Sequence, residues 1–164
     1  LFLQRTAITS CDLTMFDFAQ AVVKVKDRKH LVRLSEKILQ QVQYQPESTS
    51  VTTSAIDAFY AEQGVCQDHA HILIAMCRAL QLPARYVSGY IYDENQPHLA
   101  SHAWAEVFVE NEWYCFDVSN QIFTPKNHIY VAVGRDYLDV APIRGIREQG
   151  GVESMMSVVQ VLAC

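Results

Sequence analysis

The first half of the chain carries apolar residues at helical spacing. Between residues 28 and 44, apolar side chains recur three or four positions apart, which is the spacing of one helix face. A second stripe over 65–80 predicts the strongest helix, which ends before Pro83 because the residue preceding a proline avoids helical geometry. Two shorter helices are predicted in this half, over 13–25 and from a cap at Thr53 or Ser54 to Tyr60.

After Pro83 the hydrophobic pattern changes to an alternation with a period of two, which predicts strands with one buried face. A turn at 110–112 joins two of these runs into a β-hairpin. Helices followed by an antiparallel sheet predict an α+β protein in which N-terminal helices pack on the sheet. The expected strands are 85–92, 102–109, 113–118, 129–134 and 154–162.

Length and composition indicate one globular domain. The 164 residues fit a single domain over 1–164, and half of them are hydrophobic, which is enough for a core. The net charge of −5 argues against nucleic acid or an anionic membrane as the partner. No apolar run approaches the roughly 18–20 residues of a membrane-spanning helix. Because the chain starts abruptly and without Met, we expect the natural protein to extend upstream.

The cysteines are odd in number and irregularly spaced. Disulfide scaffolds and zinc sites use closer, paired spacings, so we expect neither here, and no metal. A reducing compartment, the cytoplasm, is the expected location, and any cysteine chemistry would depend on a single thiol. The cysteines are Cys11, Cys66, Cys77, Cys115 and Cys164.

Cys66 is the candidate nucleophile, because it falls in the first turn of the predicted helix 65–80. Unpaired N–H groups and the helix dipole stabilise a thiolate there. Packing in the core is the alternative role for this cysteine. His102 begins one strand of the predicted hairpin and Asp117 ends the other, so antiparallel pairing brings them close. His102 is then a candidate base, and Asp117 the carboxylate that orients it.

Three sequence blocks resemble the bacterial transglutaminase-like family, whose members have the papain-like cysteine-protease fold. They are GVCQDHAHILIAMCRALQLPARYVSGY, SHAWAEVF and EWYCFDVSN, and they occur in the family's order. The similarity runs from about Val42 to Ile146 and includes HIYVAVGRDYLDVAPIRG. The resemblance implies a Cys66–His102–Asp117 triad, and a β-rich domain upstream of this core.

The chain also departs from relatives in ways that bear on activity. Animal transglutaminases place an oxyanion-binding tryptophan upstream of the nucleophile, whereas Trp104 and Trp113 both follow Cys66. Tyr44, in a Tyr-x-Pro context, is a candidate substitute donor, with a core tyrosine as the alternative. Trp104 should share a strand face with His102, as a wall of the cleft, a shield for the ion pair or a core residue.

The predicted activity is cysteine-dependent acyl transfer at an amide through a thioester. We expect hydrolysis, as in a protease or amidase, of a peptide or other amide substrate, with no cofactor. Two alternatives stay open: a true transglutaminase with an amine acceptor, and a non-catalytic peptide-binding module on the same scaffold. The sequence does not determine the acyl substrate or the oligomeric state.

Overall fold

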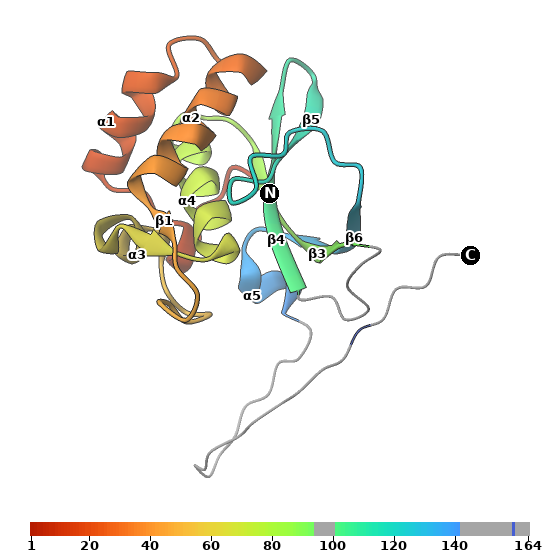
Figure 1. The fold of residues 1–164 in the computed structure, drawn as a ribbon. Helices are drawn as coiled ribbons and strands as arrows, with labels where there is room; N and C mark the ends of the chain where they lie inside the picture. The colour runs from red at the N-terminus through yellow and green to blue at the C-terminus, as the bar shows by residue number, and fades with distance from the viewer. Residues whose placement is uncertain (94–100, 142–158, 160–164) are drawn as a thin grey trace.

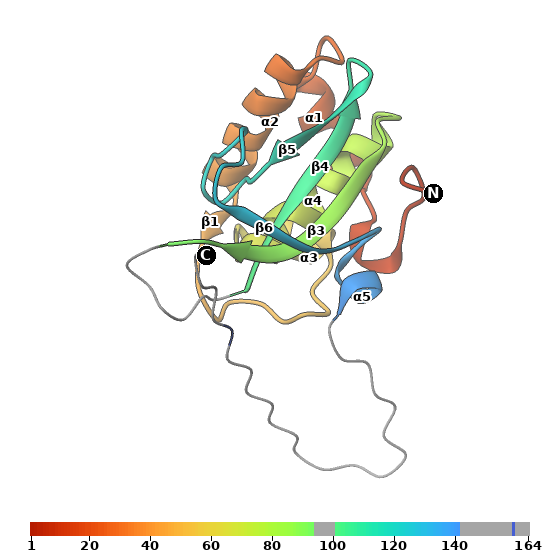
Figure 2. The same cartoon turned by 90° about the vertical axis from the view of Figure 1, so that its right-hand side faces the viewer.

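The protein is described here by a computed structural model that covers residues 1–93, 101–141 and 159. The four longer helices lie on one side of a four-stranded sheet (Figure 1), and the view turned by 90° shows the strands side by side in front of them (Figure 2). The predicted α+β arrangement is confirmed. No helix within these ranges is long and apolar enough to cross a membrane.

Five of the six described helices begin after a residue whose side chain accepts a hydrogen bond from the first turn. Asp12 accepts from the Met15 N–H at 2.9 Å, and Ser54 accepts from the Asp57 N–H at 3.1 Å, so each satisfies a backbone donor that has no partner within the helix. The described helices are η1 (Ala7–Thr9), α1 (Leu13–Val22), α2 (Arg28–Gln41), α3 (Ala55–Ala61), α4 (Cys66–Ala79) and α5 (Tyr137–Val140).

The main sheet has the strand order β5-β4-β3-β6, and all neighbouring strands are antiparallel. Its strands are β3 (Ala84–Ile91), β4 (Ser101–Val109), β5 (Glu112–Phe116) and β6 (His128–Gly134). A separate parallel pair is formed by β1 (Gln43–Tyr44) and β2 (Gln63–Gly64). Four of the five predicted strands are therefore present, and the fifth, 154–162, lies outside the described residues apart from position 159.

Helix α4 forms the centre of the core. Helices α1, α2 and α3 contact it, as do strands β3 and β4, so it lies between the helical layer and the sheet. All of its residues from Gln67 to Arg78 are buried. The sequence predicted a single apolar stripe on this helix, but the buried surface is wider than that. Helices cover one side of α4 and the sheet covers the other, so even its two histidines are buried.

The predicted helix over 28–44 is too long at its end. Helix α2 stops at Gln41, and the chain then turns into β1. The Gln43 N–H donates to the Glu62 carbonyl at 2.9 Å, and the Gln45 N–H donates to the Gly64 carbonyl at 2.8 Å. These bonds to a segment about twenty residues away replace the next helical turn, and they place Tyr44 beside the entrance to α4.

One buried cation joins four parts of the chain. The Arg78 guanidinium, almost fully buried, donates to the Thr9 hydroxyl at 2.8 Å and to the Arg135 carbonyl at 2.7 Å. It also donates to the carbonyls of Phe2 at 3.1 Å and Ala84 at 2.8 Å. Arg78 thus links the N-terminal segment, the start of β3 and the end of β6 to the central helix.

Replacing Arg78 with methionine should lower the free energy of unfolding by about 3 kcal/mol or more, because several buried acceptors lose their charged donor at once. Arg78→Lys should recover only part of the loss, since an ammonium cannot reproduce the guanidinium geometry. Urea denaturation measures both, with exposed Arg33→Met as the control. A methionine variant as stable as the parent would contradict this role.

Candidate active site

The entrance to α4 is built around Cys66, the first residue of the helix. Val65 precedes it in an extended conformation, and its N–H donates to Asp68 Oδ2 at 2.8 Å. Thr49 donates to the same oxygen at 2.6 Å, which holds the polar loop before α3 against the helix start. Asp68 therefore caps the helix, as the position of a carboxylate in the first turn suggests.

Tyr44 lies next to this entrance because β1 and β2 pair in parallel, with Tyr44 opposite Gly64. Its side chain is 51% exposed, so it is not a core tyrosine. Partial burial, followed by the charge of Cys66, raises the pKa of the Tyr44 hydroxyl. The residue is thus close enough to Cys66 for the two groups to influence each other.

His102 and Asp117 lie in hydrogen-bonding contact, as expected from the predicted hairpin. His102 Nε2 lies 2.8 Å from Asp117 Oδ2, and because a carboxylate only accepts, Nε2 carries the hydrogen. The β4–β5 register pairs Ala105 with Phe116, so Asp117 continues opposite Trp104 and reaches His102 diagonally along the same face. Asp117 is fully buried.

Cys66 contributes to the electrostatics of the His102 ring. Burial alone would lower the pKa of His102, but hydrogen bonds with Asp117 and with Cys66 outweigh burial and raise it to about 9. Burial would likewise raise the pKa of Asp117, and hydrogen bonds from His102 and His128 hold it below its ordinary value instead. The imidazole therefore interacts with a thiol and with a carboxylate.

Two further groups hold Asp117, and the sequence reasoning missed both. The Asn120 backbone N–H donates to Oδ1 at 3.2 Å, and its side-chain amide donates to Oδ2 at 3.0 Å. His128 Nε2, at the start of β6, lies 3.0 Å from the same Oδ2. An Asn three residues after an Asp is a recognisable turn signal. The contact of His128 has no such local signal.

Trp104 shares a face with His102, as predicted, but is fully buried. The two rings stack with centroids 6.0 Å apart, and the His128 ring packs edge-on against the indole at 4.7 Å. Gly89 makes room for it, because a Cβ there would lie 2.7 Å from the indole and 2.0 Å from the Ile129 carbonyl. Trp104 thus packs against both imidazoles and does not line an open cleft.

His69 joins the two sides of this site from within α4. One ring nitrogen, Nε2, donates to the Val42 carbonyl at 2.7 Å, so the other, Nδ1, accepts from the Ser119 hydroxyl at 2.8 Å. Burial lowers the pKa of His69. The neutral imidazole therefore links, through its two hydrogen bonds, the segment that carries Tyr44 to the segment that carries Asp117.

A metal ion has one candidate set of ligands among the described residues. The ligand atoms of His102, Asp117 and His128 all lie within 4.8 Å of one another. Both imidazole Nε2 atoms carry hydrogens that already point at Asp117 Oδ2. An ion would have to replace both of these hydrogens, so the arrangement as it stands fits hydrogen bonding better than ligation.

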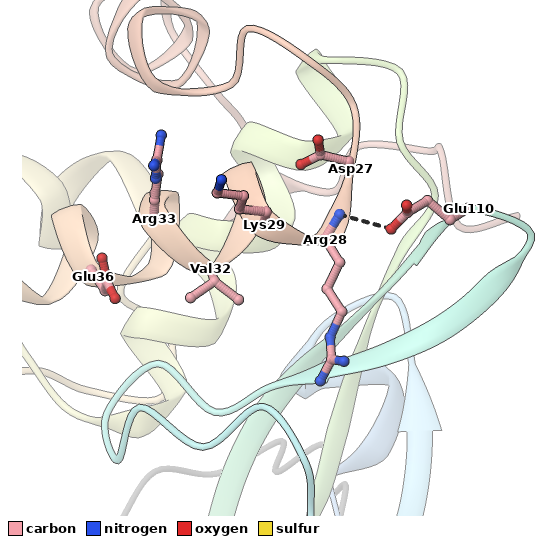
Figure 3. A pocket seen from close by; sticks show the side chains of 7 residues that line it. All are labelled: Asp27, Arg28, Lys29, Val32, Arg33, Glu36 and Glu110. Carbon is pink, nitrogen blue, oxygen red and sulfur yellow. Dashed lines mark hydrogen bonds between the residues drawn. The ribbon is translucent and has the colours of Figure 1, made fainter.

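A pocket of about 580 Å³ lies elsewhere, between the start of α2 and the β4–β5 turn (Figure 3). The Arg28 backbone N–H donates across it to Glu110 at 3.0 Å. Its lining combines basic and acidic side chains and includes none of the groups above: Asp27, Arg28, Lys29, Val32, Arg33, Glu36 and Glu110. None of the side chains that line this pocket is a thiol, a hydroxyl or an imidazole.

Comparison with known sequences identifies the family of this chain. The family model of the transglutaminase-like superfamily matches residues 17–118. An uncharacterized protein of Mycobacterium leprae is 32% identical over 166 aligned positions, covering 97% of this chain and 59% of that protein. An uncharacterized protein of Mycobacterium tuberculosis is 36% identical over 137 residues, which cover 76% of this chain and 44% of that protein. The chain thus spans about half the length of the curated relatives it matches.

Comparison with solved structures agrees. A candidate cysteine protease from Cytophaga hutchinsonii superposes with a TM-score of 0.75 at 32% identity, covering 85% of this chain and 48% of that one. The periplasmic domain of TgpA from Pseudomonas aeruginosa, bound to ethylmercury, superposes with a TM-score of 0.56 at 21% identity. The match covers 73% of this chain and 48% of that one. The second likeness concerns the fold alone.

Proposed function

Because the chain belongs to the transglutaminase-like superfamily, we propose that it is a cysteine-dependent acyl-transfer enzyme that hydrolyses a peptide or related amide. The observation that carries this proposal is the ring of His102, which bonds to the buried Asp117 on one side and interacts with Cys66 on the other. An imidazole between a thiol at a helix start and a buried carboxylate is suited to nucleophilic catalysis.

In the proposed reaction the Cys66 thiolate attacks the amide carbonyl carbon and forms a tetrahedral intermediate. The His102 imidazolium protonates the leaving nitrogen, the C–N bond breaks and a thioester remains. His102 then takes a proton from water, whose oxygen attacks the thioester. The second tetrahedral intermediate collapses, the C–S bond breaks, the carboxylic acid leaves, and the Cys66 thiolate and the His102 imidazolium are restored. Throughout, Asp117 accepts from Nε2, which keeps the ring in one tautomer and orientation.

Hydrolysis is favoured over amine transfer by one comparison. The relative from Cytophaga hutchinsonii, itself a candidate cysteine protease, combines 32% identity with a TM-score of 0.75. Incubation of a peptide mixture with and without a fluorescent alkylamine separates the two outcomes. We expect free carboxylate products in both reactions, and incorporation of the amine at the expense of hydrolysis would indicate a transglutaminase.

Thiol reactivity tests the proposal and separates it from a non-catalytic binding module. Burial raises the pKa of Cys11 to about 11 and of Cys115 to about 12, and that of Cys77 further still, so these thiols should be inert near neutral pH. Iodoacetamide near pH 6 should therefore alkylate Cys66 alone in a Cys164→Ser background, where the last cysteine outside the described residues is absent.

The His102→Ala variant is the matched test of the pair. His102 has a pKa of about 9, so below that pH it is a cation beside the thiol. Its removal should slow alkylation of Cys66 near pH 6 by tenfold or more, as measured by mass spectrometry. Equal rates in parent and variant would mean that the imidazole does not activate the thiol, and the binding-module alternative would stand.

Tyr44 is the proposed side-chain donor to the oxyanion, together with the Cys66 backbone N–H. The half-exposed position of the residue and the influence of Cys66 on its hydroxyl support the role. Tyr44→Phe should lower kcat by about 100-fold with little change in stability, since the ring is retained and only one donor is lost. The exposed Tyr60→Phe is the control, and unchanged turnover in Tyr44→Phe would remove Tyr44 from the mechanism.

A further inference from the structure

His128 is a buried titratable group that contacts the proposed triad but has no part in the proposed reaction. Its side chain is only 1% exposed, and its Nε2 lies 3.0 Å from Asp117 Oδ2. The same oxygen is 2.8 Å from His102 Nε2 and accepts the Asn120 side-chain amide at 3.0 Å. Three donors thus converge on one carboxylate oxygen, and only one of them belongs to the proposed triad.

The surroundings of His128 hold its ring in place. Residue 128 pairs with Ile91 on β3, and the ring packs perpendicular to Trp104 at 4.7 Å. Because the carboxylate only accepts, His128 Nε2 carries a hydrogen, and its Nδ1 has no hydrogen-bond partner among the described residues. The one polar contact that its side chain makes there is therefore the bond to Asp117.

We propose that His128 is a positioning residue that moderates the hold of Asp117 on His102 and so controls how readily His102 gives up its proton. The inference rests on the proposed function. Each hydrogen bond to a carboxylate stabilises its anionic form and makes it a weaker base. A carboxylate that shares Oδ2 between two imidazoles binds the His102 imidazolium less tightly than one devoted to His102 alone, which favours proton release to the leaving nitrogen.

A test of this role must change one group at a time among those that face His102 and Asp117. Cys66 faces His102 from α4, and His128 faces Asp117 from β6. The neutral His69 acts on Asp117 from α4, through the segment that carries Ser119. Of these, His128 alone can be altered without changing Cys66 or His69. Its substitution therefore isolates the effect of the second imidazole on Asp117.

The test is an NMR titration of the His102 ring, which needs no turnover. His128→Phe keeps the edge-on packing against Trp104 but removes the donor, and should raise the pKa of His102 by about half a unit or more. His128→Gln, which retains an N–H donor, should leave it near the parent value. His30→Phe, which alters a His–Asp pair elsewhere on α2, is the control and should change nothing. His128→Leu replaces the phenylalanine variant if that one does not fold.

The pH–rate profile of kcat/KM gives a second readout. The alkaline limb, which reports loss of the His102 proton, should move upward with His128→Phe and stay in place with His128→Gln. An unchanged His102 titration in all variants would overturn the inference and leave His128 a packing residue. A stoichiometric divalent ion in the purified protein, lost in both variants, would also overturn it, since His128 would then be a ligand. A shifted titration in a protein without turnover would support the coupling and count against the proposed reaction instead.

Discussion

Cys66→Ala should reduce turnover of a peptide amide by about 10⁴-fold or more while leaving the fold intact, because no covalent intermediate can form without the thiol. Cys66 is only partly buried at the edge of the core, so the small cavity left behind should cost little stability. Turnover is measured on the substrate found by peptide screening, and the fold by circular dichroism and thermal unfolding.

Cys11→Ala is the matched control for this experiment. Cys11 is also a free, partly buried thiol packed against the core, but it lies before α1 and away from His102. Its replacement should leave turnover unchanged. If Cys66→Ala and Cys11→Ala retained equal activity, the nucleophile would have to be sought elsewhere and the proposed reaction would be wrong.

Asp117→Asn should lower kcat by about 10⁴-fold, because an amide cannot fix the His102 tautomer or stabilise its cation as a carboxylate does. The substitution also has a structural cost. An amide offers one acceptor oxygen where the carboxylate offers two, and donors point at both oxygens of Asp117, the Asn120 backbone N–H at Oδ1 and three others at Oδ2. At least one N–H should lose its acceptor, at a cost of about 2–3 kcal/mol in the free energy of unfolding.

The same variant should alter acid denaturation in a defined direction. Asp117 has a pKa below its ordinary value in the folded state, so its ionised form adds stability above pH of about 3.8, and that contribution is lost as the pH falls further. Asp117→Asn lacks this contribution, so its stability should fall less steeply than the parent's between about pH 4 and pH 2. Parallel curves would mean that Asp117 is not held as a charged acceptor.

The interaction of His102 with Asp117 could be predicted from the sequence because the contact is local. Fifteen residues and one turn separate them, and the alternation of apolar and polar positions sets the hairpin register. Cys66 could be placed at a helix start for a similar reason, since the apolar stripe that predicts α4 lies within one segment. Both predictions used contacts that a single element or hairpin determines.

Other features depended on partners far along the chain. The helix predicted through Tyr44 ends at Gln41 because residues 43 and 45 bond to the segment before α4. Trp104, for which both a cleft wall and a core position were open, is buried because β6 and Gly89 enclose it. Neither outcome has a local signal, since each depends on which distant strand lies beside the residue.

Periodicity and local signals in the sequence therefore determined the order of the four longer helices and of the four strands of the main sheet, the α+β class and the three candidate residues of the proposed triad. The tertiary structure alone decided that Tyr44 stands beside the helix entrance and that His128 shares the oxygen of Asp117. The physical reason is the range of the interactions. Hydrophobic spacing encodes which face of an element is buried, whereas the side chains that meet at a site are selected when the core brings distant elements together.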